Sequence, residues 1–267
     1  MSAIKLDGRR AADRMLVQLK KKIRRTREPI TLATILVGSR YDSSLYVRLK
    51  RRAATRVGIK TEAHHLPATT KQASLTRLIR ALNHRKNISG ILLQLPLPSR
   101  LDADAAIRVI DPRKDVDGFH PRNAVVVPPP VAAVLRLINL GQPPRGSFAA
   151  IVAQPSVFTA RLATELARHG FVPAVVEPHR NLNLVTTKAD IVVTALGQGA
   201  RLTARDVKRG AIIVDVGIRR HGKKTIGDVH PSAWKKAKAI SPVPGGVGPL
   251  TVSCVLENTY QLAEHQS

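Results

Sequence analysis

The sequence predicts an α/β protein built from two lobes. Short apolar runs that end at Gly or Pro alternate with segments of helical periodicity along the whole chain, and strands separated by helices form parallel βαβ units. About 43% of the 267 residues are apolar, which is enough for a sizeable core. Proline clusters between residues 120 and 145 divide the pattern into two halves, and this length allows two modest domains.

The first half alternates helix and strand from its start. Residues 11–27 are predicted to form a helix because apolar side chains recur at spacings of three and four, and Pro29 should end it. The apolar run 32–37, closed by Gly38, is typical of a buried strand. The further elements expected here are a helix at 43–57 with Gly58 as its cap, a strand at 61–66, a helix at 74–83 and a strand at 90–95.

The second half repeats this alternation. A helix is expected at 131–139, and the apolar run 148–153 should be a strand followed by a helix at 158–169. The remaining elements are expected to be strands at 171–176, 190–195 and 211–216 and a last helix from Thr251, its predicted N-cap, to Glu264.

Charge is the most unusual property of the sequence. Lys and Arg number 44 against 18 Asp and Glu, which gives a net charge of +26, and residues 1–100 alone hold 23 basic and five acidic side chains. Such an excess attracts nucleic acid, anionic membranes or anionic small molecules, and it is equally compatible with a solvated basic surface. Aromatic residues make up only 3%, which argues against a single-strand nucleic-acid binder built on stacking.

Cysteine usage and hydropathy exclude other classes. The single Cys254 excludes a disulfide framework and a cysteine-based zinc site, and no metal site is predicted. No apolar run approaches the roughly 20 residues that span a bilayer, and the N-terminus lacks the apolar segment of a secretory signal. We therefore expect a soluble, cytoplasmic protein.

Tyr46 and Lys50 are the first candidate site residues. Their spacing of four places both side chains on one face of the predicted helix 43–57. A lysine that is crowded by cations or desolvated loses its proton more readily and can act as a base. The spacing alone is also compatible with a solvated lysine on a basic helix, which is the commoner case.

Two further polar positions follow the strand at 90–95. Gln94 lies at its carboxyl end, the edge of a parallel sheet where ligands bind, and it could equally be a core amide with a satisfied hydrogen bond. Asp115 and Asp117 precede Gly118, a pattern typical of a turn. Either carboxylate could instead hold a ring amine or amidine.

Six segments along the chain carry further information. They are Tyr46–Lys50 (YVRLK), Gly90–Pro98 (GILLQLPLP), Lys114–Pro121 (KDVDGFHP), Gly210–Gly217 (GAIIVDVG), Gly227–Val229 (GDV) and the Gly/Pro loop Pro242–Pro249 (PVPGGVGP). Together these segments resemble the methylenetetrahydrofolate dehydrogenase/methenyltetrahydrofolate cyclohydrolase family, a family of bifunctional folate enzymes. They occur in the family's order over nearly the whole chain, and their combination is highly specific.

The resemblance implies a catalytic N-terminal lobe, residues 1–122 completed by a C-terminal helix at 251–265, and a Rossmann-like NAD(P) lobe, residues 123–250, with a cleft between them. It also implies a homodimer, a tetrahydrofolate substrate that is polyglutamylated, and NADP as cofactor. Lys50 resembles the family's catalytic lysine, Gln94 the amide that hydrogen-bonds it, and Tyr46 the tyrosine that stacks on the folate. Asp117 resembles the carboxylate that holds the pterin. The other implied substrate contacts are Ser43, Pro244, Gly245 and Gly246. Ser156, Thr159 and Ile218 are the candidate cofactor contacts of this chain.

The sequence departs from the family on the cofactor side. The family's turn Gly-x-Ser-x-x-Val-Gly-x-Pro is replaced by residues 153–161, with Ala153 and Thr159 where glycines are expected and Arg161 where proline is. Glycines let a pyrophosphate approach a helix N-terminus. The connection at 125–130 is also shortened. We therefore expect weak NADP binding and a dehydrogenase activity that is low or lost, unless Ser156, Thr159, Arg161 or Arg180 supplies other donors.

Two functions from different classes are considered. The first is oxidation of methylenetetrahydrofolate with NADP and hydrolysis of methenyltetrahydrofolate to 10-formyltetrahydrofolate. The alternative is a non-catalytic relative that binds nucleic acid through its basic N-terminal lobe. The sequence favours the enzyme, because Tyr46, Lys50, Gln94 and Asp117 are all present and no nucleic-acid-binding motif is visible.

Overall fold

The structure, a computed structural model, describes residues 3–39, 41–178, 182–222 and 224–266, and only the backbone of 41–44. The chain forms two compact units. The unit of residues 13–129 and 252–267 is called the lysine unit here because it contains Lys50, and the unit of residues 1–12 and 130–251 is called the sheet unit. The mixed α/β fold with parallel strands agrees with the predicted fold class.

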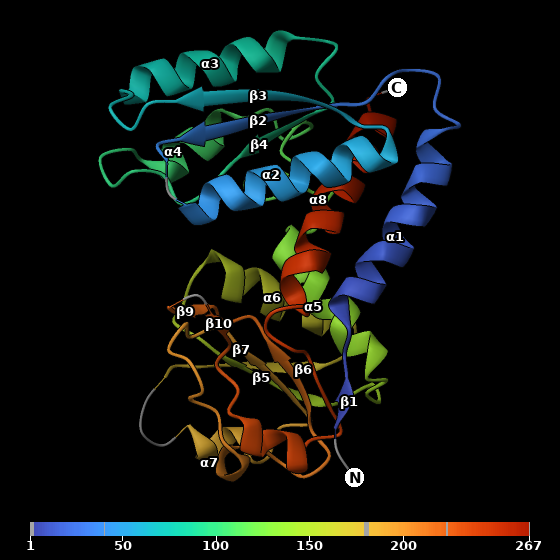
Figure 1. Ribbon diagram of the computed structural model, residues 1–267, viewed down its shortest axis with the longest axis vertical. Helices are drawn as coiled ribbons and strands as arrows, with labels where there is room; N and C mark the ends of the chain where they lie inside the picture. Colours follow the sequence, from blue (N-terminus) through green and yellow to red (C-terminus); the bar gives the residue numbers. More distant parts are fainter. Residues whose placement is uncertain (1–2, 40, 179–181, 223, 267) are drawn as a thin grey trace. The chain divides into compact units, whose positions relative to one another are not determined.

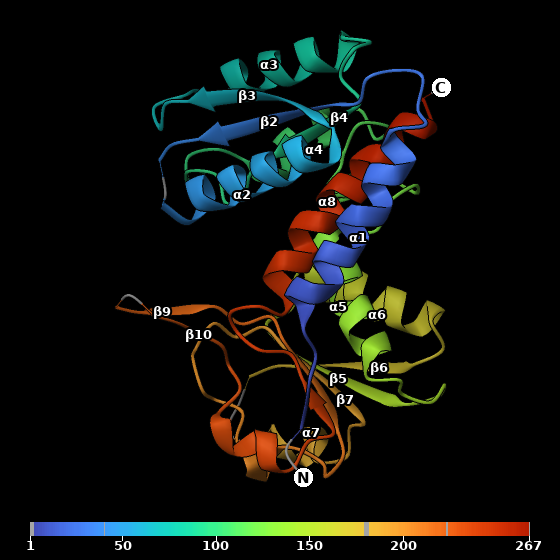
Figure 2. The ribbon, with the colours of Figure 1, turned by 45° about the vertical axis from the view of Figure 1, so that its right-hand side comes forward.

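The lysine unit is built on a three-stranded parallel sheet in the order β3-β2-β4. Figures 1 and 2 show helix α3 on one face of this sheet and α2 on the other. The strands of this unit are β2 (Thr31–Val37), β3 (Lys60–Leu66) and β4 (Gly90–Leu93), and its helices are α2 (Tyr41–Val57), α3 (Gln72–His84) and α4 (Ala103–Val109). Helices α1 (Gly8–Ile23) and α8 (Val247–Glu264) contribute residues to both units.

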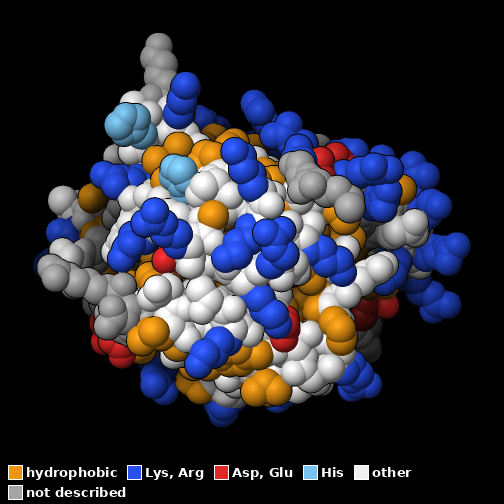
Figure 3. All heavy atoms as spheres, turned by 90° about the horizontal axis from the view of Figure 1, so that it is seen from below, with side chains coloured by type: hydrophobic (Ala, Val, Ile, Leu, Met, Phe, Trp, Pro, Cys, Tyr) orange, Lys and Arg blue, Asp and Glu red, His pale blue; other side chains and the backbone are white. Residues whose placement is uncertain are grey.

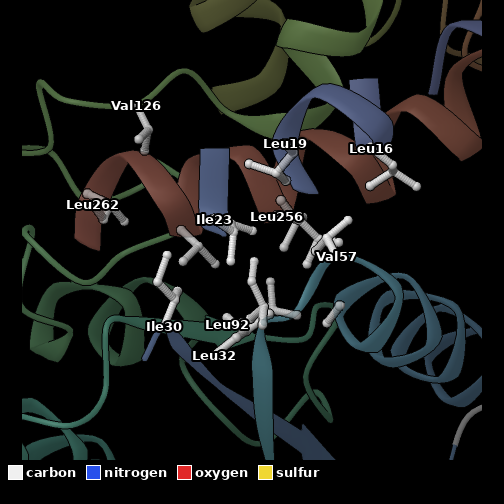
Figure 4. Close-up of a cluster of buried hydrophobic side chains, with 14 residues drawn as sticks. Leu16, Leu19, Ile23, Ile30, Leu32, Val57, Leu92, Val126, Leu256 and Leu262 are labelled. Atoms are coloured by element: carbon white, nitrogen blue, oxygen red, sulfur yellow. The ribbon is translucent and has the colours of Figure 1, made fainter. Parts of the chain in front are cut away.

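Apolar side chains on both faces of this sheet are buried, as expected for a parallel sheet covered by helices. Figure 4 shows Leu32 and Leu92 from the sheet facing Leu19 of α1 and Leu256 of α8. On the other face, the helical spacing of α3 brings its buried apolar side chains, Leu75, Ile79 and Leu82, into a second cluster. These two cores fix the ends of β2 and β4, from which the candidate site is built.

The sheet unit contains a six-stranded sheet in the order β1-β11-β8-β7-β5-β6, in which every recorded neighbouring pair is parallel. Its strands are β1 (Ile4–Lys5), β5 (Phe148–Val152), β6 (Val172–Val176), β7 (Ile191–Thr194), β8 (Ile212–Asp215) and β11 (Ala239–Ile240). Its helices are α5 (Pro129–Leu140), α6 (Val157–Arg168) and α7 (Asn183–Thr186), and β9 (Arg219–His221) pairs with β10 (Lys224–Ile226) as a hairpin. Two 3₁₀ helices span Ala204–Asp206 and Pro231–Lys235.

The two end helices differ from the prediction. Helix α8 begins at Val247, so Thr251 is not its N-cap but lies one turn inside, where its hydroxyl donates to the carbonyl of Val247 (3.0 Å). Proline is tolerated in a first helical turn because its missing N–H would have no partner there, and Pro249 occupies that turn. Helix α1 ends at Ile23, whose carbonyl accepts both the amide and the hydroxyl of Thr26.

The surface reflects the excess of basic residues. The face drawn in Figure 3 carries Lys and Arg side chains over much of its area and few Asp or Glu. Within the described residues, no helix is both long and apolar enough to cross a membrane.

Candidate active site

Lys50 lies on the last half of α2, and its side chain is almost fully removed from water at 6% exposure. Its Nζ donates a hydrogen bond to Oε1 of Gln94 (3.0 Å), the residue that follows β4. The Gln94 amide nitrogen donates in turn to the carbonyl of Leu95 (2.7 Å), and the Gln94 backbone amide donates to Ile35 of β2 (2.9 Å). The carboxyl edge of the sheet therefore aims the amide oxygen of Gln94 at the lysine.

The protonation of Lys50 is controlled by its burial. Desolvation lowers the pKa of the Lys50 ammonium, and the carboxylate of Asp117 opposes this effect by raising it. The neighbouring Arg51 and Arg52 are exposed, so the lowered pKa arises from burial rather than from the crowding of cations suggested by the sequence. A solvated surface lysine, the alternative left open by the spacing, is excluded.

Asp117 is the acidic partner in this arrangement. The pKa of Asp117 is raised to about 7, chiefly by burial, with Lys50 opposing the rise and the nearby Asp115 contributing to it. Asp115 has a different role, because its carboxylate accepts the backbone amides of Asp117 (3.2 Å) and His120 (2.8 Å). The spacing alone could not distinguish the two aspartates, although the family resemblance points to Asp117. In the structure, Asp115 accepts the backbone amides of the turn, and Asp117 is the carboxylate that interacts with Lys50.

The other predicted substrate contacts are less closely defined. Tyr46 lies one turn before Lys50 on α2 and is half-buried, and the side chain of Ser43 lies outside the described residues. Pro244, Gly245 and Gly246 belong to the sheet unit. Within the lysine unit, Lys50 is thus joined to Gln94 by a hydrogen bond and to Asp117 by a charge interaction, whereas this loop belongs to the other unit.

The loop of Gly245 and Gly246 has structural reasons for its glycines. Gly245 has a positive φ of 112°, and its carbonyl accepts the amide of Arg9 (3.0 Å). A Cβ on Gly246 would approach the carbonyl oxygen of Pro242 to 2.8 Å, which is closer than real contacts allow. The backbone of this loop therefore needs glycine whether or not a ligand approaches it.

The turn after β5 differs in character from a glycine-rich turn. Ser156 and Thr159 form a capping box in which each side chain oxygen accepts the other residue's backbone amide, at 3.2 and 2.8 Å. Ala153, at 3% exposure, places a methyl group at the end of β5.

The Nε of Arg161 is buried without a hydrogen-bond partner among the described residues. Ile218, the other predicted cofactor contact, is 50% exposed beside β9, and Arg180 lies outside the described residues.

A second group of amides at the carboxyl edge of the six-stranded sheet is already satisfied. Four successive backbone amides donate to the buried carboxylate of Asp228, at 2.6, 3.2, 2.9 and 3.2 Å, and these are the amides of Leu196, Gly197, Gln198 and Gly199. Such a nest of amides is otherwise suited to an anion from outside the chain. Asp228 was visible to sequence reasoning only as part of the GDV motif, with no role attached.

The site geometry defines what the lysine unit can do. A buried amine with a lowered pKa can take a proton from water, and a carboxyl that titrates near neutrality can accept N–H donors when ionised. Within the described ranges, no group of three His, Cys, Asp or Glu side chains is arranged to hold a metal ion. Proton transfer by side chains is the chemistry that these residues supply.

The six-stranded parallel sheet with its helices places the chain among the α/β proteins with a Rossmann-like unit. Residues 6–117 match the tetrahydrofolate dehydrogenase/cyclohydrolase catalytic domain, and residues 128–267 match the NAD(P)-binding domain of the same enzymes. The chain belongs to the tetrahydrofolate dehydrogenase/cyclohydrolase family, as its motifs predict.

Individual relatives agree over the full length. The bifunctional protein FolD of Moorella thermoacetica is 41% identical, over 98% of this chain and 99% of the relative. The FolD crystal structure from Campylobacter jejuni superimposes with a TM-score of 0.95 at 35% identity, covering 100% of both chains. The FolD structure from Trypanosoma brucei, complexed with NADP cofactor and inhibitor, gives a TM-score of 0.94 at 32% identity, covering 99% of this chain and 98% of that one.

Proposed function

We propose that this chain interconverts one-carbon tetrahydrofolates, with hydrolysis of methenyltetrahydrofolate to 10-formyltetrahydrofolate as its faster reaction and NADP-dependent oxidation of methylenetetrahydrofolate as its slower one. The observation that carries the proposal is the buried Lys50, which donates a hydrogen bond to Gln94 and interacts electrostatically with Asp117. Membership of a family whose relatives are named as bifunctional enzymes supports it, and favours it over the nucleic-acid-binding alternative.

In the proposed hydrolysis, Lys50 acts as the general base. Neutral Nζ takes a proton from a water molecule while the water oxygen bonds to the cationic methenyl carbon. The bond from that carbon to N5 then breaks, the hydroxyl proton is transferred to N5, and a formyl group remains on N10. Lys50 releases its proton to solvent, so one water is consumed and one proton is produced. Gln94 keeps the amine oriented, because its Oε1 accepts one Nζ hydrogen and the lone pair stays free for the water proton.

Asp117 and Tyr46 are proposed to hold the folate. An ionised carboxylate presents two acceptor oxygens that suit the paired N–H donors of a pterin edge. Tyr46, one turn from Lys50 on the same helix, is proposed to stack on the folate ring. We propose Ser43, Pro244, Gly245 and Gly246 as further substrate contacts.

The pH dependence of substrate binding tests this function. We expect the purified chain to hydrolyse methenyltetrahydrofolate with a KM that rises as the pH falls below about 7, because protonation of Asp117, whose pKa is about 7, removes its acceptor pair. Asp117→Asn should raise KM about 10- to 100-fold at pH 8, the cost of charged hydrogen bonds, and should flatten the pH dependence of KM. Initial rates across pH 5.5 to 8.5 measure both.

Protein stability provides the control for that variant. A carboxyl whose folded-state pKa is raised stabilises the fold below its unfolded pKa, and this contribution is lost as the pH rises through about 7. Asp117→Asn should therefore unfold no more easily than the wild type at pH 8, which thermal denaturation checks. A wild-type hydrolysis rate no faster than that of buffer would overturn the proposed function.

A glycine-rich turn lets the pyrophosphate of NADP approach the backbone, and the residues at the carboxyl edge of the six-stranded sheet do not form such a turn. The capping box occupies the hydroxyls of Ser156 and Thr159 and the amides they face, and Ala153 adds a methyl group where close backbone approach is needed. The Asp228 carboxylate fills the nearby nest of amides. Within the described ranges, the Nε of Arg161, in the second turn of α6, is a buried donor without a hydrogen-bond partner. We propose NADP as a weakly bound cofactor, with Ser156, Thr159 and Ile218 as its candidate contacts.

The assignment of lobes and of the assembly is also proposed. Residues 1–122 with a helix at 251–265 would form the folate lobe, and residues 123–250 the cofactor lobe, as the family resemblance implies. Matches to the catalytic and NAD(P)-binding domains of the family support the division into two lobes. We also propose a cytoplasmic homodimer, as the family resemblance implies.

The basic surface of α2 is proposed to meet a polyglutamate tail on the folate. Arg48, Arg51 and Arg52 are exposed on the helix that carries Lys50. We expect Kd to fall about two- to fivefold for each of the first glutamates added, and this gain to shrink between 50 and 500 mM salt as the charges are screened. Equilibrium binding of mono-, tri- and pentaglutamates measures it. Tail-independent folate binding combined with tight duplex binding near physiological salt would favour the nucleic-acid alternative.

A further inference from the structure

Asp115 is buried, at 2% exposure, in the loop that carries Asp117, and the proposed chemistry does not use it. We infer that Asp115 is a positioning residue for Asp117: its carboxylate holds the backbone from which Asp117 projects and places a second negative charge beside it. This inference rests on the proposed function and adds to it a residue that controls the pH range of the same site.

The side chain of Asp115 organises the loop by accepting hydrogen bonds at both oxygens. Oδ1 accepts the backbone amide of Asp117 (3.2 Å), and Oδ2 accepts the backbone amide of His120 (2.8 Å) and the Asn123 side chain amide (3.4 Å). The carbonyl of Asp115 also accepts the Asn123 side chain (2.8 Å). Gly118 follows with a positive φ of 65°, which lets the chain turn back toward these donors.

The rest of the unit fixes Asp115 itself. Residue 115 forms an isolated parallel bridge with Ile91 of β4, and the carbonyl of Lys114 accepts the amide of Ile91 (2.6 Å). The Asn258 side chain on α8 donates to the carbonyl of Val116 (2.9 Å). Because the loop is fixed to a strand and a helix on both sides of Asp115, the carboxylate has a fixed position from which to orient Asp117.

Two charged groups act on Asp117, Lys50 from α2 and Asp115 from its own loop, and their effects are opposite. The other charged groups of the loop face elsewhere: Lys114 donates its Nζ to the carbonyls at the end of α3, and Nδ1 of His120 accepts the amide of Arg122 (3.1 Å). Burial raises the pKa of Asp115 above its usual value while three backbone amides and the Asn123 side chain lower it. Its hydrogen bonds with amides are those that an ionised carboxylate makes.

Removal of the charge and displacement of the carboxylate are separable by mutation. Asp115→Asn keeps the size of the side chain and removes the charge. Asp115→Glu keeps the charge and moves the oxygens away from the amides they accept. Asp111→Asn is the matched control, because it also removes a carboxylate from this loop. The charge partner of Asp111 is the exposed Arg113 (2.7 Å) and not Asp117.

Two readouts are measured on each full-length variant. The first is the titration midpoint of the Asp117 carboxyl carbon, followed by ¹³C NMR in the absence of folate, and the second is KM for methenyltetrahydrofolate against pH. In Asp115→Asn we expect the Asp117 midpoint and the acid limb of KM to move to lower pH by about one unit. In Asp115→Glu the midpoint should stay near that of the wild type while KM at pH 8 rises about tenfold. Asp111→Asn should change neither.

An Asp117 midpoint that does not move in Asp115→Asn would overturn the inference. So would an unchanged KM at pH 8 in Asp115→Glu, which tests positioning even where the Asn variant fails to fold. The NMR titration needs no folate, so it decides on Asp115 even if the wild type proves to have no hydrolase activity. If the wild type hydrolyses normally and the Asp117 titration midpoint is unchanged in Asp115→Asn, the role of Asp115 is rejected and the proposed function still stands.

Discussion

Replacement of Lys50 by alanine should lower kcat for methenyltetrahydrofolate hydrolysis by about 10²–10⁴, the usual cost of removing a general base. The amine is the buried group whose pKa is lowered by desolvation, and Gln94 holds it at 3.0 Å. Lys50→Gln should lose as much, because an amide can fill the space and meet Gln94 but cannot take a proton. Single-turnover hydrolysis with saturating substrate measures the loss independently of binding.

Arg56→Ala is the matched control for Lys50→Ala, since Arg56 is an exposed cation on the same helix, paired with Asp13 (2.7 Å), and has no proposed substrate contact. It should hydrolyse at close to the wild-type rate. In the wild type, kcat should rise with pH as the Lys50 ammonium, whose pKa is lowered from its usual value, loses its proton, and both Lys50 variants should lose this rise. Near-normal hydrolysis by a folded Lys50→Ala protein would exclude Lys50 as the base.

The strands of this fold are readable from the sequence because each is an apolar run with a clear end. The run 32–37 closed by Gly38 lies within one residue of β2, and the segment 148–153 within one residue of β5. Parallel strands that are covered on both faces must be apolar throughout, so the sequence signal is strong. The predicted alternation of helix and strand is accordingly confirmed in both units.

Elements held by capping or by few backbone bonds escaped prediction. Helix α4 has only seven residues and depends on Asp102, whose carboxylate accepts the amide of Ala105 (2.9 Å). The hairpin of β9 and β10 has no alternating apolar pattern. The start of α8 was placed at Thr251 because Gly248 and Pro249 resemble a loop, although both are tolerated in a first helical turn.

The family resemblance predicts the hydrogen bond between Lys50 and Gln94, and the structure contains it (3.0 Å). Spacing alone relates only Tyr46 to Lys50 on one helix, because Gln94 and Asp117 are distant in the sequence. The parallel sheet brings Gln94 and the loop after α4 into the same unit as α2. The division of roles between Asp115 and Asp117 depends on which carboxylate folds back onto the backbone, and both precede the same glycine.

NADPH formation should be slow relative to hydrolysis in this chain, by about 100-fold or more. Ala153 and Thr159 stand where the family has glycines, and we expect their side chains to obstruct the close approach of a pyrophosphate. Obstructions of a few kcal/mol each would weaken binding by at least two powers of ten, since about 1.4 kcal/mol corresponds to a tenfold change in affinity. Assays of both half-reactions on one preparation, with NADP and NAD titrations followed by nicotinamide fluorescence, measure this ratio and the affinities.

Restoring the first glycine tests the cause of this weakness. Ala153→Gly should tighten NADP binding about tenfold and raise the dehydrogenase rate at fixed NADP while leaving hydrolysis unchanged, because the missing methyl reopens the backbone at the end of β5. Ala189→Gly is the matched control, since Ala189 is also buried but precedes β7 at the opposite edge of the sheet, and it should not change binding. Micromolar NADP affinity with rapid NADPH formation in the unmodified chain would contradict the prediction. It would show that phosphate is bound through other donors. The buried Nε of Arg161 is the first such donor to test, by Arg161→Leu.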